Sequence, residues 1–415
     1  MIVALESPDG KVIKSLLKIA DNLGISLAKL PRLSELKSNI DQLEIKPIVI
    51  DDVLGRKAKT PNLGRREELI KGKRILVTGA GGTIGSELVR QIAQNNPAQI
   101  CLFELSEHNL YQIDKELEEK FPNINRSAVI GDIRDLSQLD RVFKNHKPEI
   151  VFHAAALKHV PLVEENLTEA VNTNIIGTKN VADICIKHKT SKMTMISTDK
   201  AVKPTSLMGV TKRIAEFYIQ TVGKDSKSTN FAIVRFGNVL GSSGSVIPLF
   251  ERQLKQGGPL TVTHPQMTRF FMTISEAVEL VLQASTLPCE GENTSLFVLD
   301  MGEPISINDL AIQIIELAGL EPEKDIKIEY TGVRPGEKLY EELFYPHEQQ
   351  QSTLYEGIFH AIATPINGKE FLTNLKKIIT TCKNGSDDDV KEQLLKIVPE
   401  YYIPEIEQEF NKRAA

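Results

Sequence analysis

The sequence predicts an α/β protein built on a Rossmann-like, doubly wound parallel sheet, with a smaller C-terminal lobe and an N-terminal α/β remnant. Two observations predict this fold class. From residue 73 onward, short runs rich in Val, Ile, Leu and Phe alternate with helical patterns, as expected for parallel strands that are buried on both faces. One of these runs leads directly into a glycine-rich turn and then a helix, which is typical of the first unit of such a sheet.

The expected strands follow one another at the spacing of strand–helix units. They are Arg74–Thr78, Ile100–Glu104, Ser127–Gly131, Glu149–His153, Lys192–Ser197, Asn230–Phe236 and Ser295–Leu299. Past about residue 240 the pattern becomes irregular and is interrupted by Pro and Gly, as in Gly257-Gly258-Pro259. This change indicates a lobe built differently from the sheet.

Five segments follow from this organisation. They are residues 1–50, a remnant of an α/β domain; 51–70, a linker; 71–240, the dinucleotide-binding domain; 241–350, mainly the smaller lobe, with a strand near 295–300 that returns to the sheet; and 351–415, a C-terminal helical extension. Within the remnant, Ile2–Leu5 and Ile25–Leu30 are strand-like, and Val12–Leu23 carries apolar residues at helical spacing.

Composition restricts the classes of function. The chain has 415 residues, which is enough for two or three domains, and a formal net charge of −5, which gives no electrostatic support for nucleic-acid binding. The four cysteines are scattered without a CxxC pair, so we expect thiols in a reducing cytoplasm and no metal site. We see no secretion signal and no apolar run of the roughly 20 residues that a membrane span needs.

A dinucleotide site is predicted at the first strand–turn–helix unit. Gly79, Gly82 and Gly85 let the backbone approach a pyrophosphate, and the helix that begins near Thr83 and Ile84 points its amides at the anion. Glu104 ends the next strand, where a carboxylate accepts hydrogen bonds from ribose hydroxyls and repels a 2′-phosphate. We therefore expect NAD rather than NADP.

Further residues are placed at the ends of the next strands. Asp132 and Ile133 follow the third strand, where Asp132 can reach an adenine. The small residues Ala154, Ala155 and Ala156 end the fourth strand and let a cofactor lie flat. Asn174 lies in the following helix, where a structural role for its amide is as plausible as a functional one.

The segment after the fifth strand carries side chains that could take part in catalysis. It reads Ser197-Thr198-Asp199-Lys200 and continues to Met208-Gly209-Val210-Thr211-Lys212. Together with Arg235-Phe236-Gly237-Asn238-Val239, Thr268-Arg269-Phe270-Phe271-Met272 and Arg334-Pro335-Gly336-Glu337-Lys338, it resembles the extended short-chain dehydrogenase/reductase family. Within that family the chain is most similar to the UDP-N-acetylglucosamine 4,6-dehydratases, over roughly residues 70–350. Residues 1–60 resemble the tail of the regulatory domain in the long, membrane-bound members.

The resemblance implies a reaction in which C4 of the sugar is oxidised, water is eliminated across C5 and C6, and C6 is reduced. NAD would be regenerated in each turnover and stay bound. By analogy, Asp199 is the acid toward the C6 hydroxyl and Lys200 the base at C5, while Thr198 can hold the 4-hydroxyl and Lys212 binds the nicotinamide ribose. Met208 occupies the position of the family's usual tyrosine, and a thioether cannot carry a proton.

Met at this position is typical of members that retain configuration at C5. The expected product is UDP-2-acetamido-2,6-dideoxy-α-D-xylo-hexos-4-ulose. A Tyr-x-x-x-Lys pattern does occur at Tyr111–Lys115, but it lies too early in the fold to serve. Which group deprotonates the 4-hydroxyl stays open.

The UDP-sugar substrate requires groups for its diphosphate, ribose and sugar. Guanidinium forks suit phosphates, a carboxylate suits ribose hydroxyls, and the remaining groups lie near the sugar by analogy. The expected substrate residues are Lys158, His159, Arg235, Asn238, Arg252, Arg269, Arg334 and Glu337. We also expect a homo-oligomer, a dimer or larger.

Two rival functions stay open. An NAD-dependent nucleotide-sugar epimerase of the same fold needs no acid at C6 and normally keeps the tyrosine, so Asp199 and Met208 argue against it. A non-catalytic nucleotide-binding regulator would suit the loss of tyrosine, but not an intact Asp199–Lys200 pair.

Overall fold

The computed structural model divides into two compact units. The described residues are 1–4, 12–13, 15–16, 19–20, 23, 25, 27–29, 46–47, 63–289, 293–362 and 366–403. The first unit comprises Met1–Thr60, Val239–Thr273 and Glu303–Gly332, and the second comprises Pro61–Asn238, Ile274–Gly302 and Val333–Ala415. Each unit is therefore assembled from segments that are far apart in sequence.

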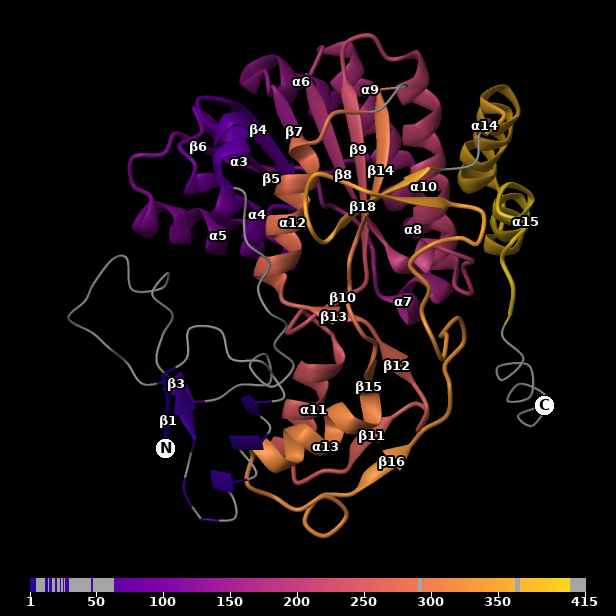
Figure 1. The fold of residues 1–415 in the computed structure, drawn as a ribbon. Coiled ribbons are helices and arrows are strands. Elements are labelled where there is room, and N and C mark those ends of the chain that lie inside the picture. Colours follow the sequence, from indigo (N-terminus) through magenta and orange to yellow (C-terminus); the bar gives the residue numbers. More distant parts are fainter. Residues whose placement is uncertain are drawn as a thin grey trace. The chain divides into compact units, whose positions relative to one another are not determined.

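The second unit is built on a nine-stranded sheet with the order β17-β18-β14-β9-β8-β7-β4-β5-β6 (Figure 1). The seven strands from β14 to β6 are parallel. Their bounds are β4 Arg74–Thr78, β5 Gln99–Glu104, β6 Arg126–Ile130, β7 Ile150–His153, β8 Lys192–Thr198, β9 Asn230–Phe236 and β14 Thr294–Leu299. The expected fold class and all seven expected strands are confirmed, with boundaries that move by one residue at most.

Successive strands are added on one side of β4 as far as β6 and on its other side from β7 onward, so the direction in which the sheet grows reverses at β4. In open parallel sheets, ligands bind at the carboxyl ends of the strands beside such a reversal. The ends of β4, β7 and β8 are therefore the place to look for a site.

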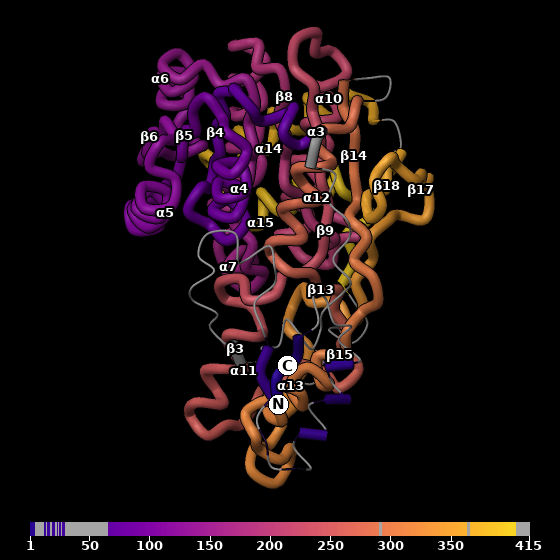
Figure 2. Tube along the Cα trace, turned by 60° about the vertical axis from the view of Figure 1, so that its left-hand side comes forward, coloured from indigo at the N-terminus to yellow at the C-terminus, as the bar shows by residue number. Residues whose placement is uncertain are grey.

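Helices flank the sheet, and α12 lies along α4 in both views of the chain (Figures 1 and 2). On the other side, α10 packs against α9, and side chains of both join one large apolar core with those of the central strands. The helices of this unit are α3 Leu63–Ile70, α4 Thr83–Ala93, α5 Glu107–Lys120, α6 Leu136–His146, α7 Val160–Glu165, α8 Leu167–Ala170, the π-helix η1 Val171–Gly177, α9 Thr178–Lys187, the 3-10 turn η2 Asp199–Ala201, α10 Leu207–Asp225, α12 Ile274–Thr286, α14 Gly368–Asn384 and α15 Asp387–Ile397.

Two expected segments need correction. Residues 63–70, assigned to a linker, form α3, while residues 51–62 lie outside the described residues. The segment from 351 is not wholly helical, because β17 (Gln349–Ser352) and β18 (Ile358–Ile362) pair antiparallel and add two strands beside β14. The helical expectation holds for α14 and α15.

The first unit contains short strand pairs and two amphipathic helices. Its strand pairs are β10 Asn238–Val239, of which Val239 belongs to this unit, with β13 Phe271–Met272; β11 Leu260–Val262 with β16 Ile328–Tyr330; and β12 Thr268–Arg269 with β15 Ile305–Ser306. Its helices are α11 Val246–Lys255 and α13 Ile307–Leu317. It is narrower than the expected lobe over 241–350, because α12 and β14 return to the large sheet and residues from Val333 belong to the second unit.

The N-terminal residues include a small sheet in the order β1-β2-β3, with β1 Ile2–Val3 parallel to β2 Ala28–Lys29, and β2 antiparallel to β3 Lys46–Pro47. The described residues between Val12 and Ala20 are helical, as expected, whereas Leu5 and Leu30 lie outside the described residues. No helix in the described part of the chain is both long and apolar enough to cross a bilayer.

Candidate active site

The glycine turn between β4 and α4 is shaped by close backbone contacts. Gly79 has φ +66°, and a Cβ there would lie 2.7 Å from the Ala155 amide nitrogen. A Cβ on Gly85 would lie 1.9 Å from the Gly79 carbonyl oxygen. Gly82 begins α4 without a side-chain cap, so no side chain of its own occupies the helix N-terminus. This arrangement fits a bound pyrophosphate.

Glu104 lies against the same turn. Its Oε2 accepts a hydrogen bond from the Gly81 amide at 3.0 Å, and its Oε1 accepts one from the Ser106 amide at 3.0 Å. Both bonds fix the carboxylate at the end of β5, where a ribose would follow a pyrophosphate held by the turn. The residues therefore fit a dinucleotide, and Thr83 and Ile84 lie in the first turn of α4 as expected.

The end of β7 is held by a buried polar network. His153 is fully enclosed, and its two ring nitrogens lie 2.8 Å from Thr78 Oγ1 and 2.9 Å from Thr178 Oγ1. Burial lowers the pKa of His153 to about 3, so the ring is neutral. The turn of Ala154, Ala155 and Ala156 follows directly and becomes progressively more exposed.

Three expected cofactor residues have clear structural partners. Asn174 is fully buried; its Oδ1 accepts from the Leu157 amide at 2.8 Å, and its Nδ2 donates to Leu157 O and to Thr211 Oγ1. We therefore revise its role from cofactor contact to support of the turn after β7. Asp132 accepts from Arg134 at 2.6 Å, and Ile133 is buried at the position facing Gly177.

The acid–base groups gather at the end of β8. Asp199 and Lys200 form the 3-10 turn η2, and Lys200 Nζ lies 3.1 Å from Asp199 Oδ1. The same nitrogen donates to Asn238 Oδ1 at 3.1 Å and lies 3.4 Å from Glu341 Oε1. Thr198 Oγ1 donates to Asp199 Oδ1 at 2.8 Å. Thr198, Asp199 and Lys200 are thus brought together, and Asn238, expected to bind substrate, joins them.

The Asp199 carboxyl is placed in an environment that favours its protonated form. Its side chain is 1% exposed, and Oδ2 is buried with no hydrogen-bond partner among the described residues. Burial raises the pKa of Asp199; the Lys200 ammonium opposes the rise and the Glu341 carboxylate adds to it. A carboxyl that keeps its proton near neutral pH can act as a general acid.

Met208 and Lys212 lie on the first turns of α10, which begins after the N-cap Ser206. Met208 is 3% exposed and belongs to the apolar core, so its side chain has a packing role. Lys212 Nζ donates to the Ile196 carbonyl at 2.9 Å, and burial lowers the pKa of Lys212 to about 8. Lys212 remains a candidate for binding the nicotinamide ribose.

A segment that sequence reasoning missed closes over the turn after β8. The Lys338 ammonium donates to the Val202 carbonyl at 2.8 Å, and the Tyr345 hydroxyl donates to the Ala201 carbonyl at 3.1 Å. These contacts bring Glu341 to Lys200. The only signal in the sequence was the position of Glu341, three residues beyond the Arg-Pro-Gly-Glu-Lys motif.

The assignment of Arg235 to substrate needs correction. Arg235 is completely buried on β9, and its guanidinium bonds Glu216 through Nε at 2.7 Å and Nη2 at 2.6 Å, and Glu348 through Nη1 at 2.9 Å. These contacts use the fork that a phosphate would need. Arg235 therefore joins β9, α10 and the segment before β17 from within the protein.

The other expected substrate residues have diverse positions. Lys158 and His159 are exposed after β7, and Arg334 is exposed with its amide bonded to Glu337 Oε2 at 3.3 Å. Arg252 on α11 and Arg269 on β12 belong to the first unit. Their roles toward substrate remain predictions.

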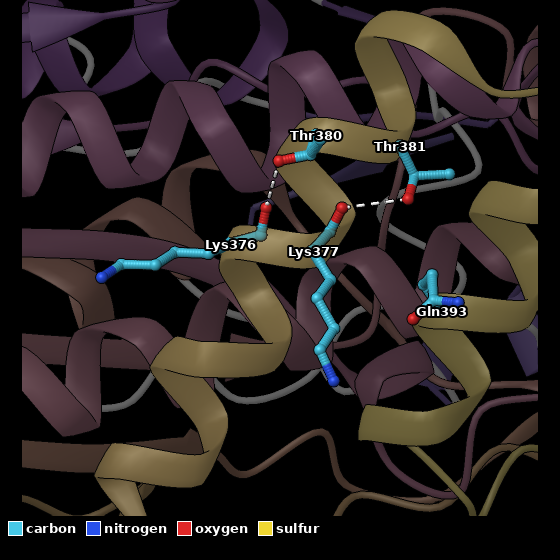
Figure 3. A pocket seen from close by; sticks show the side chains of 5 residues that line it. All are labelled: Lys376, Lys377, Thr380, Thr381 and Gln393. Carbon is cyan, nitrogen blue, oxygen red and sulfur yellow. Dashed lines mark hydrogen bonds between the residues drawn. The ribbon is translucent and has the colours of Figure 1, made fainter.

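An open hollow between α14 and α15, of about 430 Å³, is lined by Lys376, Lys377, Thr380, Thr381 and Gln393 (Figure 3). The two threonine hydroxyls donate to the carbonyls of Lys376 and Lys377, at 3.0 Å each. The hollow holds none of the acid–base residues at the end of β8, so it does not compete with them as a catalytic centre.

Comparison with known proteins adds to this geometry. A family model described as "Polysaccharide biosynthesis protein" matches residues 75–363. The chain is 46% identical over 374 residues to the capsular polysaccharide biosynthesis protein CapD of Staphylococcus aureus, over 88% of this chain and 62% of CapD. It is 33% identical to a UDP-glucose 4-epimerase of Rickettsia prowazekii, over 74% of this chain and 88% of the epimerase.

The chain is also similar in fold to solved structures. Pen from Bacillus thuringiensis is 38% identical and superposes with a TM-score of 0.64, over 72% of this chain and 90% of Pen. A double mutant of DesIV, a dTDP-glucose 4,6-dehydratase from Streptomyces venezuelae solved with NAD bound, is 20% identical with a TM-score of 0.56, over 66% and 88% of the two chains. The DesIV likeness supports the fold alone.

Proposed function

The chain belongs to the polysaccharide biosynthesis protein family, and from this premise we propose that it catalyses the NAD-dependent 4,6-dehydration of a UDP-sugar. The proposed substrate is UDP-N-acetylglucosamine, and the proposed product is UDP-2-acetamido-2,6-dideoxy-α-D-xylo-hexos-4-ulose. Because the chain spans 62% of the length of CapD, the proposal concerns the activity of this chain and not of the whole relative.

The observation that carries the proposal is the contact between Asp199 and Lys200 at the end of β8. Elimination of water across C5 and C6 needs an acid at the leaving hydroxyl and a base at C5. A buried carboxyl with a raised pKa and an amine 3.1 Å away supply both in one turn of chain. An oxidoreductase that moves only a hydride and a hydroxyl proton needs no such second pair.

The cofactor residues support NAD. Gly79, Gly82 and Gly85 would hold the pyrophosphate, and Glu104 would accept hydrogen bonds from the adenosine ribose and disfavour a 2′-phosphate. When bound, NAD supplies a hydride acceptor for C4 and a hydride donor for C6. Lys212, held by the Ile196 carbonyl, would orient the nicotinamide ribose.

The chain's own residues would move two protons. The proton lost by the 4-hydroxyl would pass through Thr198 Oγ1 to the Asp199 carboxylate, 2.8 Å away, and would return to the substrate at the C6 hydroxyl. Thr198 would hold the 4-hydroxyl, since Met208 is buried in the core and cannot accept a proton. Lys200 would accept the C5 proton, and Asp199 would protonate the departing C6 hydroxyl. Lys200 would then return its proton to C5 on the same face, which accounts for retained configuration.

One alternative has a specific observation in its favour. The 33% identity to a UDP-glucose 4-epimerase supports epimerisation at C4, which would use the same glycine turn but not the acid at C6. Proton NMR of the product from UDP-N-acetylglucosamine separates the two. Dehydration produces a C6 methyl doublet, whereas a C4 epimer without a methyl signal would show that the alternative is correct.

A further inference from the structure

Glu341 lies at the acid–base pair although nothing in the motifs around Asp199 points to it. Its side chain is 3% exposed, and its Oε1 lies 3.4 Å from Lys200 Nζ. Within the described residues, Lys200 Nζ contacts oxygens of Asp199, Asn238 and Glu341, which come from different parts of the chain. Contacts from several directions restrict the movement of this half-buried side chain.

The position of Glu341 is fixed on both sides. Lys338, three residues earlier, donates to the Val202 carbonyl, and Tyr345, four residues later, donates to the Ala201 carbonyl. Both acceptors belong to the turn that immediately follows Lys200. The backbone of the turn that carries Asp199 and Lys200 therefore also anchors the segment that carries Glu341, and keeps its carboxylate beside Lys200.

We propose that Glu341 is a positioning residue for the acid–base pair: it holds the Lys200 side chain beside Asp199, and its charge sets the pH range in which the pair carries one transferable proton. This inference rests on the proposed dehydratase function. It adds one residue, Glu341, to the same site.

The charges around Glu341 support this role. The titratable groups that face it or lie beside it are Asp199, Lys200, Lys338, Glu342 and Tyr402. A negative charge near a pair of proton-binding groups favours the protonated form of each. The Glu341 carboxylate therefore raises both pH values at which the Asp199–Lys200 pair changes its proton content.

The proton balance of the elimination agrees with this assignment. The C5–H bond breaks, its proton goes to Lys200 Nζ and its electron pair becomes the C5–C6 double bond. The C6–O bond breaks as Asp199 gives its proton to the leaving hydroxyl, which departs as water. The pair begins with one proton on Asp199 and ends with one on Lys200, so Glu341 keeps its charge and stabilises the new ammonium.

The test compares Glu341→Gln with the matched control Glu342→Gln, since Glu342 is the neighbouring acid and pairs with Lys203 at 2.7 Å. Two measurements are made on the full chain. The first is the pH dependence of Lys200 acetylation by trace acetic anhydride, followed by peptide mass spectrometry. The second is the pH profile of kcat with UDP-N-acetylglucosamine.

We expect Glu341→Gln to lower the apparent pKa of Lys200 and to move both limbs of the kcat profile to lower pH by about one unit or more. We also expect kcat at its optimum to fall about tenfold with KM changed less than about twofold, because positioning acts on the chemical step. Glu342→Gln should leave both measurements near wild type.

Unchanged Lys200 labelling and an unchanged kcat profile in a folded Glu341→Gln protein would overturn the inference. If that variant does not fold, Glu341→Asp replaces it, because it keeps the charge but withdraws it by one methylene, and a wild-type Lys200 pKa and profile would again overturn the inference. A wild-type protein that makes no C6 methyl product refutes the proposed function instead, while the labelling result still decides the position of Glu341.

Discussion

Lys200 Nζ lies 3.1 Å from Asp199 Oδ1 on consecutive residues of a single 3-10 turn at the end of β8. The two groups differ in exposure, with 1% of the Asp199 side chain and 23% of the Lys200 side chain accessible. A buried acid and a more accessible amine in contact can exchange a proton with each other and with a substrate that reaches the amine.

This relationship predicts the effect of removing either group. Asp199→Asn and Lys200→Met should each lower kcat for dehydration by about 10²-fold or more, since positioned acids and bases contribute about 10²–10⁴-fold. The measurement is the rate of C6 methyl formation by proton NMR. Lys203→Met is the matched control, because Lys203 pairs with Glu342 and lies outside the pair.

The role assignment fails if both variants turn over at the wild-type rate. A loss in Lys203→Met as large as that in Lys200→Met would also contradict it, because the effect would then be one of surface charge.

The packing of the glycine turn predicts that alanine destabilises the protein much more at Gly85 than at Gly82. Gly85→Ala should destabilise the protein by about 1–3 kcal/mol or more, because its Cβ would lie 1.9 Å from the Gly79 carbonyl oxygen, on backbone that cannot move aside cheaply. Gly82→Ala should cost less, since its nearest atom lies at 3.3 Å. Thermal unfolding measures both, and equal midpoints for the two variants would argue against the packing account.

Glu104 should decide between the two nicotinamide dinucleotides. Glu104→Ala should weaken NAD binding by about tenfold, in keeping with the loss of charge-assisted hydrogen bonds, and should narrow the preference for NAD over NADP. Isothermal titration with each cofactor provides the measurement. Glu107→Ala, an exposed acid on the first turn of α5, is the control. An unchanged NAD/NADP ratio in Glu104→Ala would show that the carboxylate does not face the ribose.

The buried network around Arg235 predicts a stability effect instead of a binding effect. Arg235→Met should lower the free energy of unfolding by about 3–5 kcal/mol, because it leaves buried carboxylates without their partner. Arg334→Met, at an exposed arginine, should leave the unfolding midpoint near wild type and raise KM. A raised KM with unchanged stability in Arg235→Met would restore the substrate role.

The same network sets a pH dependence. Burial raises the pKa of Glu216, but Arg235 and Arg213 outweigh burial and hold it at about 2, below the ordinary value of 4.5. A carboxylate with a depressed pKa stabilises the fold fully above pH 4.5 and loses that contribution as the pH falls toward 2. The difference in unfolding midpoint between wild type and Arg235→Met should therefore shrink below pH 4.5, which acid-range thermal scans would detect.

Local features of the site were readable from sequence, because their physics is local. The turn from Thr78 to Gly85 follows an apolar strand, and Glu104 ends the next one, so spacing alone placed them. Thr198, Asp199 and Lys200 were placed in the same way, since they continue a strand into a turn.

Features that depend on contacts between distant parts of the chain could not be predicted from the sequence. Arg235 looked like a phosphate ligand because its partners lie 19 and 113 residues away. β17 reads Gln349-Gln350-Gln351-Ser352, has no apolar alternation and is exposed throughout, so only its pairing with β18 makes it a strand. Glu341 contacts Lys200 although the two residues are 141 positions apart, and no local sequence pattern predicts such a contact.

Turnover of UDP-N-acetylglucosamine in D₂O tests the central claim most directly. If Asp199 and Lys200 carry out the elimination, the product acquires a C6 methyl group and a deuterium at C5. The Lys200→Met variant should lose most of its turnover and, with it, the incorporation of deuterium at C5. A product that keeps its C6 hydroxyl and its original C5 proton would contradict the account.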